Sequence, residues 1–306
     1  MSPRQLRLQL LGEILIYALI CRFFCSGELG MPARAAIVLA LALGVRALII
    51  GVSYAFAARW PSPPPLHLRA ATLEKIGAWF AEWLSLTLLS LFILPFERLW
   101  MGPDRLRPAT DGRPPVLLIH GYLANRGFWY WLRQRLERHG WIVATISLQP
   151  VYSDIDAYVD QVTQRIDEVL AECRSSQLVL IGHSMGGLVS RAYLRRHGGG
   201  KVARLITLGS PHKGSRLATL GLGRNARQME VGSAWLKQLE ATDAAPFPPT
   251  VAVYSYGDNF VMPQESARLD HLPDARHVAV PSIGHIGMAL SPEFGRTLIE
   301  VLEGTT

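Results

Sequence analysis

One pentapeptide of the chain has the composition of a nucleophilic site. Gly182-His183-Ser184-Met185-Gly186 fits the pattern G-x-S-x-G, in which a serine lies on a sharp turn between a strand and a helix. An apolar run, Leu178–Ile181, leads into this turn, and Gly187–Arg196 follows with helical composition. The glycines permit the close helix–strand approach and the strained backbone that such a turn requires. The sequence therefore predicts that Ser184 is a nucleophile rather than an ordinary helix cap.

A nucleophilic serine needs a general base, and the base needs a carboxylate that orients it. In chains with this turn, the partners follow in the order serine, acid, histidine. His285 lies in a glycine-rich turn after the last predicted strand, where a base can reach the carboxyl edge of a sheet. Asp258 follows the predicted strand Val251–Tyr254, and we expect it to be the acid. Asp243 and Asp270 are the rival acids.

The same mechanism needs two backbone N–H groups that bind the negative charge developing on the substrate's carbonyl oxygen. We expect one of these oxyanion donors to be Met185, directly after the nucleophile. The other is expected to be Tyr122, in the turn His120-Gly121-Tyr122 that follows the first predicted strand. His120 itself is expected to stabilise this turn rather than to carry a proton.

The elements around these residues alternate between strands and helices. The predicted strands are apolar throughout, which favours a parallel sheet with helices on both faces. The helix predicted over 157–172 places its valines and Ile166 on one side, as an amphipathic helix does. The predicted strands are 116–119, 141–146, 178–181, 205–208, 251–254 and 277–280, and the other helices are 128–139, 186–197 and 292–302.

The first 96 residues have a different character. They contain three apolar stretches, Leu8–Phe24, Ala36–Ala58 and Ile76–Phe96, of which the second and third reach the ~20 residues that cross a bilayer. Each includes an ionisable residue such as Glu82, which costs ~3 kcal/mol at the bilayer centre, although charges on neighbouring helices can pair. The sequence predicts a helical transmembrane anchor of two to three spans over 1–96 and a linker over 97–113. Core helices of a soluble domain are the alternative.

Composition excludes several classes of protein. Hydrophobic residues make up 49% of the 306 residues and charged residues 18%, below the ~25% typical of soluble domains, which excludes a disordered chain. The net charge of +7 is divided almost evenly between the apolar first third and the rest, so we expect no nucleic-acid partner. Cys21, Cys25 and Cys173 are too few and too scattered for a disulfide framework or a zinc site. We expect no cofactor and no metal.

Several stretches of residues 114–306 resemble the α/β-hydrolase superfamily and, within it, the bacterial serine lipases and esterases. The resemblance implies an α/β-hydrolase fold with a mostly parallel sheet, a triad of Ser184, Asp258 and His285, and oxyanion donors at Tyr122 and Met185. It does not extend to residues 1–96, and many family members have a second glycine where the first turn here continues with Leu123. The matching stretches are His120-Gly121, 182–187, 210–215, 257–263 and 284–287.

By this resemblance, we expect a hydrolase that cleaves carboxylic esters of lipophilic substrates through an acyl-enzyme on Ser184, and the apolar stretches of residues 1–96 add a membrane anchor to it. A thioesterase or an acyltransferase would use the same residues, and a non-catalytic interaction protein of this fold is disfavoured because the full residue set is present. An insertion at about 211–249 is expected to cover the active site as a cap or lid; a surface excursion is the alternative. The expected location is a bacterial inner membrane, crossed several times, with the side of the catalytic domain undetermined.

Overall fold

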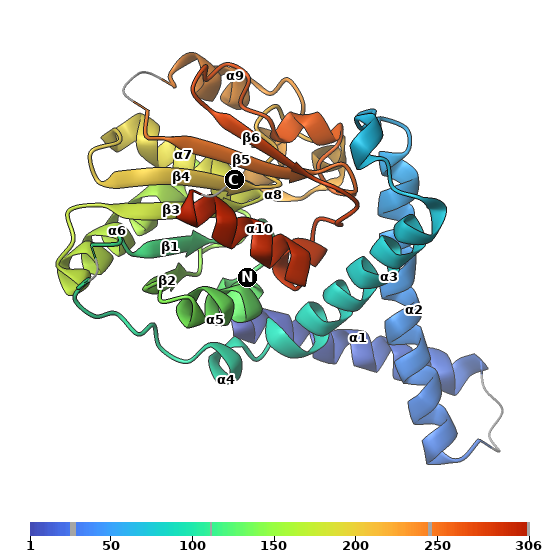
Figure 1. The fold of residues 1–306 in the computed structure, drawn as a ribbon. Coiled ribbons are helices and arrows are strands. Elements are labelled where there is room, and N and C mark those ends of the chain that lie inside the picture. The colour runs from blue at the N-terminus through green and yellow to red at the C-terminus, as the bar shows by residue number, and fades with distance from the viewer. Residues whose placement is uncertain (25–28, 111, 244–246, 305–306) are drawn as a thin grey trace.

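A parallel sheet organises the carboxyl-terminal two thirds of the chain (Figure 1). The computed structural model describes residues 1–24, 29–110, 112–243 and 247–304. Within them, six strands lie in the order β2-β1-β3-β4-β5-β6. The chain places β2 on one side of β1 and β3 on the other, so a crevice opens beyond the carboxyl ends of β1 and β3. The predicted strands are confirmed as β1 Val116–Ile119, β2 Val143–Ile146, β3 Leu178–His183, β4 Val202–Leu208, β5 Thr250–Ser255 and β6 Arg276–Val280.

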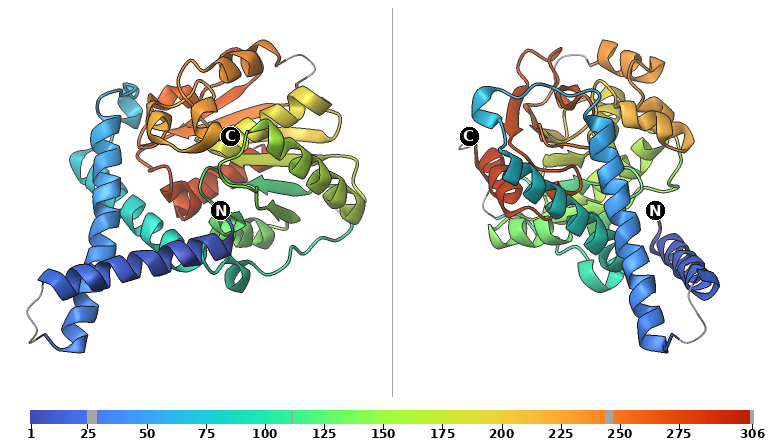
Figure 2. Two further views of the ribbon diagram at one scale, coloured as in Figure 1. Left: turned by 180° about the vertical axis from the view of Figure 1, so that it is seen from behind. Right: turned by 90° about the vertical axis from the view of Figure 1, so that its right-hand side faces the viewer.

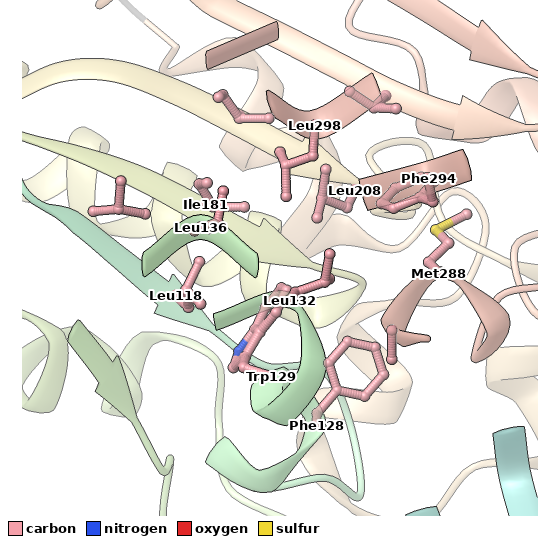
Figure 3. Close-up of a cluster of buried hydrophobic side chains, with 14 of the residues drawn as sticks. Leu118, Phe128, Trp129, Leu132, Leu136, Ile181, Leu208, Met288, Phe294 and Leu298 are labelled. Atoms are coloured by element: carbon pink, nitrogen blue, oxygen red, sulfur yellow. The ribbon is translucent and has the colours of Figure 1, made fainter. Parts of the chain in front are cut away.

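Helices cover both faces of this sheet, as the apolar strands predicted. One face carries α5 and α10, and Figure 3 shows how Leu118 and Ile181 of neighbouring strands lie in one buried cluster with Trp129 and Phe294. The other face carries α6 and α7, whose apolar sides form a second cluster with alternate residues of the same strands. The bounds of these helices are α5 Tyr130–Arg138, α6 Val159–Cys173, α7 Met185–His197 and α10 Pro292–Glu303.

The amino-terminal residues form a helical region beside this domain (Figure 2). The joined ends of α1 and α2 project away from the sheet, whereas α3 runs back toward it (Figures 1 and 2). By length and composition alone, Met31–Ala57 and Thr72–Ile93 could cross a membrane. The elements are α1 Pro3–Phe24, α2 Met31–Ala57, α3 Thr72–Leu88, a π-helical turn at Leu89–Ile93 and α4 Glu97–Met101; a short 3-10 turn, Leu66–Leu68, precedes α3.

The two sides of α3 differ in what they contact. The inner side buries Glu82 and Ser85 against the rest of the protein, and Leu89 and Ile93 continue this side into the hydrophobic cluster of Figure 3. The outer side exposes an apolar residue at every fourth position, and residues four apart lie above one another on a helix. We call this surface the outer stripe; its members are Ile76, Phe80, Leu84, Leu88 and Phe92.

Charges inside the helical region are paired. Arg46 of α2 is buried and lies 2.6 Å from a carboxylate oxygen of Glu13 of α1, which matches the expectation that charged residues of neighbouring apolar helices can pair. The guanidinium of Arg46 also donates to the Ser90 hydroxyl. The polar groups of these helices therefore face one another rather than the exposed apolar surface.

Within the segment 97–113, which was expected to be a linker, Asp104 forms ion pairs with the domain. The carboxylate of Asp104 lies 3.0 Å from the guanidinium of Arg133, 2.7 Å from that of Arg165 and 3.5 Å from that of Arg126. All four side chains are at most one fifth exposed, which protects the ion pairs from screening by solvent. The helical region consequently joins the domain through a fixed segment.

Candidate active site

Ser184 occupies the turn between β3 and α7, at the carboxyl edge of the sheet. Its backbone angles are φ 54° and ψ −125°, a conformation that costs a residue with a side chain about 1–3 kcal/mol. A Cβ atom on Gly186 would lie 2.1 Å from the carbonyl oxygen of Ile119, and one on Gly182 would lie 2.4 Å from the backbone nitrogen of Gly187. The two glycines therefore make possible the tight turn that presents Ser184.

Asp258 and His285 form a hydrogen-bonded pair near this turn. His285 Nδ1 lies 2.8 Å from Asp258 Oδ2, and the two residues are only 5% and 2% exposed. The other carboxylate oxygen, Asp258 Oδ1, accepts the N–H groups of Phe260 and Val261, each at 2.8 Å. Because Asp258 Oδ1 accepts two backbone N–H groups and Oδ2 faces the imidazole ring, His285 Nδ1 is assigned as the donor. Its Nε2 is then the free acceptor that a general base requires.

The charge state of His285 depends on competing effects. Burial by itself lowers the pKa of His285, but the charge of Asp258 and its hydrogen bond, together with the charge of Glu82, raise that pKa above its ordinary value of 6.5. The buried imidazole is therefore a stronger base than a free histidine. This arrangement favours proton abstraction at neutral or mildly alkaline pH.

His285 lies against the turn that carries Ser184. Its ring centroid is 4.5 Å from that of His183, the residue before Ser184, and His183 Nε2 lies 3.1 Å from the backbone oxygen of His285. In the described parts of the chain, Ser184 Oγ has no hydrogen bond to His285. Catalytic hydrogen bonds are often long before substrate binds, and the serine is already on the segment adjacent to the base.

The backbone N–H groups of the two expected oxyanion donors have no acceptor among the described residues. In the chain as described, neither the N–H of Tyr122 nor that of Met185 donates to another protein group. The turn before Tyr122 touches the nucleophile, because a Cβ on Gly121 would lie 2.7 Å from Ser184 Cβ. Leu123 adopts a φ of 58° in this turn, a backbone conformation that favours glycine.

His120 stabilises the oxyanion turn through two hydrogen bonds of its ring. It donates from Nδ1 to the carbonyl of Gly121 at 2.8 Å and accepts the N–H of Leu148 at Nε2, at 3.0 Å. Burial and, secondarily, the nearby amino-terminal charge lower the pKa of His120 to about 3, so its ring is neutral. These bonds match the turn-stabilising role expected from the sequence.

The rival carboxylates have other partners. Asp243 is fully buried against Arg191, with 2.5 Å between the carboxylate and the guanidinium, and it also contacts His271. Asp270 lies 2.5 Å from the Lys213 ammonium at the surface. The described contacts thus bring Asp258, and neither rival, to His285. Among described residues, no group of three or more His, Cys, Asp or Glu side chains is arranged to hold a metal ion.

Two residues of the helical region contact the loops that carry the acid and the base. Glu82 of α3 accepts the two backbone N–H groups that follow His285, and Ser53 of α2 accepts a hydrogen bond from Asn259 at 2.7 Å. Neither role was expected from the sequence. Glu82 stood out as an isolated charge in an apolar run, for which the expectation was a cost of membrane insertion that a charge on a neighbouring helix could offset.

The insertion at 211–249 divides into two parts. The first part, with short helices at Arg216–Leu220 and α8 Gly223–Gln228, borders the oxyanion turn: the Tyr122 hydroxyl donates to the carbonyl of Leu222 at 2.7 Å and accepts its N–H at 3.0 Å. The second part, α9 Ala234–Ala241, buries Leu236 and Leu239 in the cluster with α6 and α7. The first part therefore lies beside the oxyanion turn and the second packs on the helices of the domain, while a cap or lid over the site stays a prediction.

Exposed apolar side chains lie beside this border. Tyr122 and Tyr152 have ring centroids 6.3 Å apart, and Gly223 approaches Tyr152 so closely that a Cβ would lie 2.6 Å from it. Clustered exposed apolar groups are typical of ligand-binding surfaces. We call this set the apolar rim; it consists of Leu123, Tyr152, Leu220 and Leu222.

Sequence comparisons relate part of the chain to lipases. The family model described as a PGAP1-like alpha/beta domain matches residues 150–272, which include Ser184 and Asp258. Triacylglycerol lipases of Pseudarthrobacter phenanthrenivorans and Burkholderia plantarii are each 35% identical over 114 residues, 35% of this chain. The matches cover 35% and 32% of those proteins, so this chain spans about a third of the length of these relatives.

Solved structures extend the similarity to the fold of the whole domain. A mature lipase of Bacillus licheniformis superposes with a TM-score of 0.57 at 20% identity and covers 65% of this chain and 96% of that one. Lipase B of Aspergillus fumigatus has a TM-score of 0.57 at 19% identity and covers 66% of this chain and 55% of that one. The protein therefore has the α/β-hydrolase fold, and over 114 residues its sequence is similar to those of triacylglycerol lipases.

Proposed function

We propose that this protein is a membrane-associated serine hydrolase that cleaves carboxylic esters of lipophilic substrates. The observation that carries the proposal is the buried hydrogen bond between Asp258 and His285 beside the strained turn of Ser184. A buried acid–histidine pair next to an elbow serine is the arrangement that activates a hydroxyl for acyl transfer.

The mechanism follows from the positions of these groups. As Ser184 Oγ attacks the ester carbonyl carbon, His285 Nε2 takes the hydroxyl proton and Asp258 stabilises the imidazolium that forms. The N–H groups of Tyr122 and Met185 bind the oxyanion. The imidazolium then gives its proton to the departing alkoxide, which leaves an acyl-enzyme. Water then attacks the carbonyl carbon of the acyl-enzyme while His285 Nε2 takes one of its protons, and the imidazolium gives this proton to Ser184 Oγ, which releases the acid and restores the serine.

The substrate class is supported by the surface around the site. The apolar rim lies where an acyl or alkyl chain would leave the oxyanion turn, and burial of each CH₂ group there is worth about 0.8 kcal/mol. The names of the sequence relatives point the same way, since they are triacylglycerol lipases. We therefore favour esters with long apolar chains over small soluble esters.

The membrane association is supported by the exposed apolar side chains of the helical region. Phe23, Phe24 and Met31 lie near the joined ends of α1 and α2, which project from the domain (Figure 2). We place these ends in the bilayer and the outer stripe of α3 against it. The sequence predicted several membrane crossings, but the inner side of α3 is occupied by the hydrolase domain, so we propose that α3 lies along the membrane instead.

Replacement of the nucleophile tests the proposed chemistry. Ser184→Ala should lower the hydrolysis of p-nitrophenyl esters by more than about 10³-fold, because only the oxyanion donors and substrate binding then remain. The melting temperature in detergent should not fall, since alanine removes only the hydroxyl. The full-length protein should react with a fluorophosphonate probe and the variant should not.

Two controls make the test specific. A chain-length series of p-nitrophenyl esters should show a rate that increases from acetate to longer acyl groups. Matched oxygen esters and thioesters should show a preference for the oxygen esters, whereas the reverse preference would favour a thioesterase. Activity above a few percent in Ser184→Ala would show that Ser184 is not the nucleophile.

A further inference from the structure

We propose that Glu82 is a positioning residue for the general base, and that the helical region thereby completes the active site in addition to contacting the membrane. The inference rests on the proposed function, in which His285 is the base. It concerns a residue outside the hydrolase domain, 203 positions before that histidine in the sequence, on a helix that composition alone assigns to an anchor.

The Glu82 carboxylate packs against the loop of residues 284–287 that carries His285, which we call the histidine loop. Glu82 is 0% exposed, and its carboxylate accepts the N–H of Ile286 at 2.9 Å and that of Gly287 at 2.6 Å. These are the two peptide groups that follow His285. Hydrogen bonds from N–H groups to a carboxylate are roughly twice as strong as those between neutral groups. The two bonds therefore fix the direction in which the chain leaves His285.

The loop has a shape that fits this carboxylate. A Cβ atom on Gly284 would lie 2.4 Å from Glu82 Oε2 and 2.5 Å from its carboxyl carbon. The backbone of Gly284 has no positive φ, so a side chain is excluded there by Glu82 and not by the conformation. Gly284, the residue before His285, therefore leaves the space that the Glu82 carboxylate of α3 occupies.

Two further contacts from the helical region reach the same pair of loops. Asn259 donates to the Ser53 hydroxyl of α2 at 2.7 Å and accepts the N–H of His285 at 3.1 Å, so one amide side chain joins α2 to the base. On the acid side, the Ser62 N–H donates to Gln264, whose amide donates to the carbonyl of Asp258 at 2.9 Å. The acid and the base are therefore each held from outside the domain.

Such support matters because proton transfer depends steeply on position. A displacement of 1 Å at a catalytic group can lower the rate about 100-fold. The charge of Glu82 also favours the imidazolium form of His285, which develops as the serine attacks. The titratable groups facing Glu82 are His285 and Asp258 across the loop and Tyr54 from α2. Removal of the negative charge at Glu82 should therefore affect both the position and the basicity of His285.

The test compares Glu82→Gln with Glu74→Gln in the full-length protein in detergent, using p-nitrophenyl ester hydrolysis. Glu74 lies on the same helix, is exposed and also accepts a backbone N–H, at 2.7 Å, but far from the histidine loop. We expect Glu82→Gln to lower kcat about 100-fold with KM within about twofold, and to move the acid limb of the pH profile to lower pH. Glu74→Gln should retain the wild-type kcat, KM and pH profile.

A second variant keeps the proposal testable even if Glu82→Gln folds poorly. Gly284→Ala retains the charge of Glu82 and separates the two partners sterically, so we expect kcat to fall at least about tenfold while the overpacking lowers stability by only about 1–3 kcal/mol and the protein stays folded. A wild-type kcat and pH profile in Glu82→Gln, or a wild-type kcat in Gly284→Ala, would overturn the proposal. An equal loss in Glu74→Gln would also overturn it, because the effect would then come from general damage to α3.

These outcomes are separate from a failure of the proposed function. If the wild-type protein neither hydrolyses esters nor reacts with a fluorophosphonate, the proposed function fails and His285 is not a base. If the wild-type protein is active and Ser184→Ala is not, while both Glu82→Gln and Gly284→Ala behave as wild type, only the role of Glu82 fails.

Discussion

Helices α6 and α3 each bury one side against the protein, but the chemistry of the two buried sides is opposite. α6 buries Val162, Ile166 and Val169 and shows polar residues to water. α3 buries Glu82 and Ser85 and exposes the apolar outer stripe. Hydrophobic periodicity reveals the buried side only when the other side meets water. On an apolar helix, isolated polar residues mark the side that contacts protein, because a polar group facing lipid would lack partners.

The strongest test of this comparison removes the helical region. A chain that begins at Pro108 keeps every residue of the proposed triad but loses Ser53, Glu82 and the contacts of Leu89 and Ile93 with the domain core. We expect its kcat for a soluble p-nitrophenyl ester to be at least about 100-fold below that of the full chain, since the acid and base loops lose their outer support. Full activity in the shortened chain would show that the helical region is only an anchor.

The fold and the candidate residues could be predicted because their signals are local. The turn at Ser184 lies directly between the strand Leu178–His183 and the following helix. The strand consists mostly of apolar residues, and this composition alone indicates that it is buried. The role of Glu82 could not be predicted in this way, because its hydrogen bond to Gly287 joins residues 205 positions apart. Within Ile76–Phe96, Glu82 and Ser85 indicate the side that contacts protein, but they do not indicate which distant loop that side contacts.

Replacement of an apolar residue by serine should have different effects on the two sides of α3. Phe80→Ser on the outer stripe should weaken binding to phosphatidylglycerol-containing vesicles about tenfold, because it removes up to ~2 kcal/mol of apolar burial. It should not change the melting temperature in detergent. Leu89→Ser on the inner side should instead destabilise the fold by about 2–5 kcal/mol, since Leu89 belongs to the domain core.

Vesicle co-sedimentation and thermal unfolding measure these two effects separately. The comparison would be wrong if Phe80→Ser destabilised the protein as strongly as Leu89→Ser, because the outer stripe would then be packed against protein.

The smallest expected effect concerns the pH profile. His285 must be neutral to accept the serine proton, and its pKa is raised above 6.5 because the effects of Asp258 and Glu82 outweigh that of burial. The value of kcat/KM should therefore rise with pH, with a midpoint that lies above 6.5. A midpoint at or below 6.5 would mean that the two carboxylates do not act on the base. The hydrolysis rate of a p-nitrophenyl ester from pH 5 to 9 would decide this.

The hydroxyl of Tyr122 links the shape of the substrate to the rate of its conversion. The hydroxyl is bound to both backbone groups of Leu222 in the apolar rim, while the backbone N–H of the same tyrosine is the proposed oxyanion donor. An ester too bulky for the rim would displace Leu222 and turn Tyr122 with it, so it would still bind but would lose electrostatic support in its transition state. Selection among esters would then appear in kcat rather than in KM, and a bulky ester would act as a competitive inhibitor of the smaller ones.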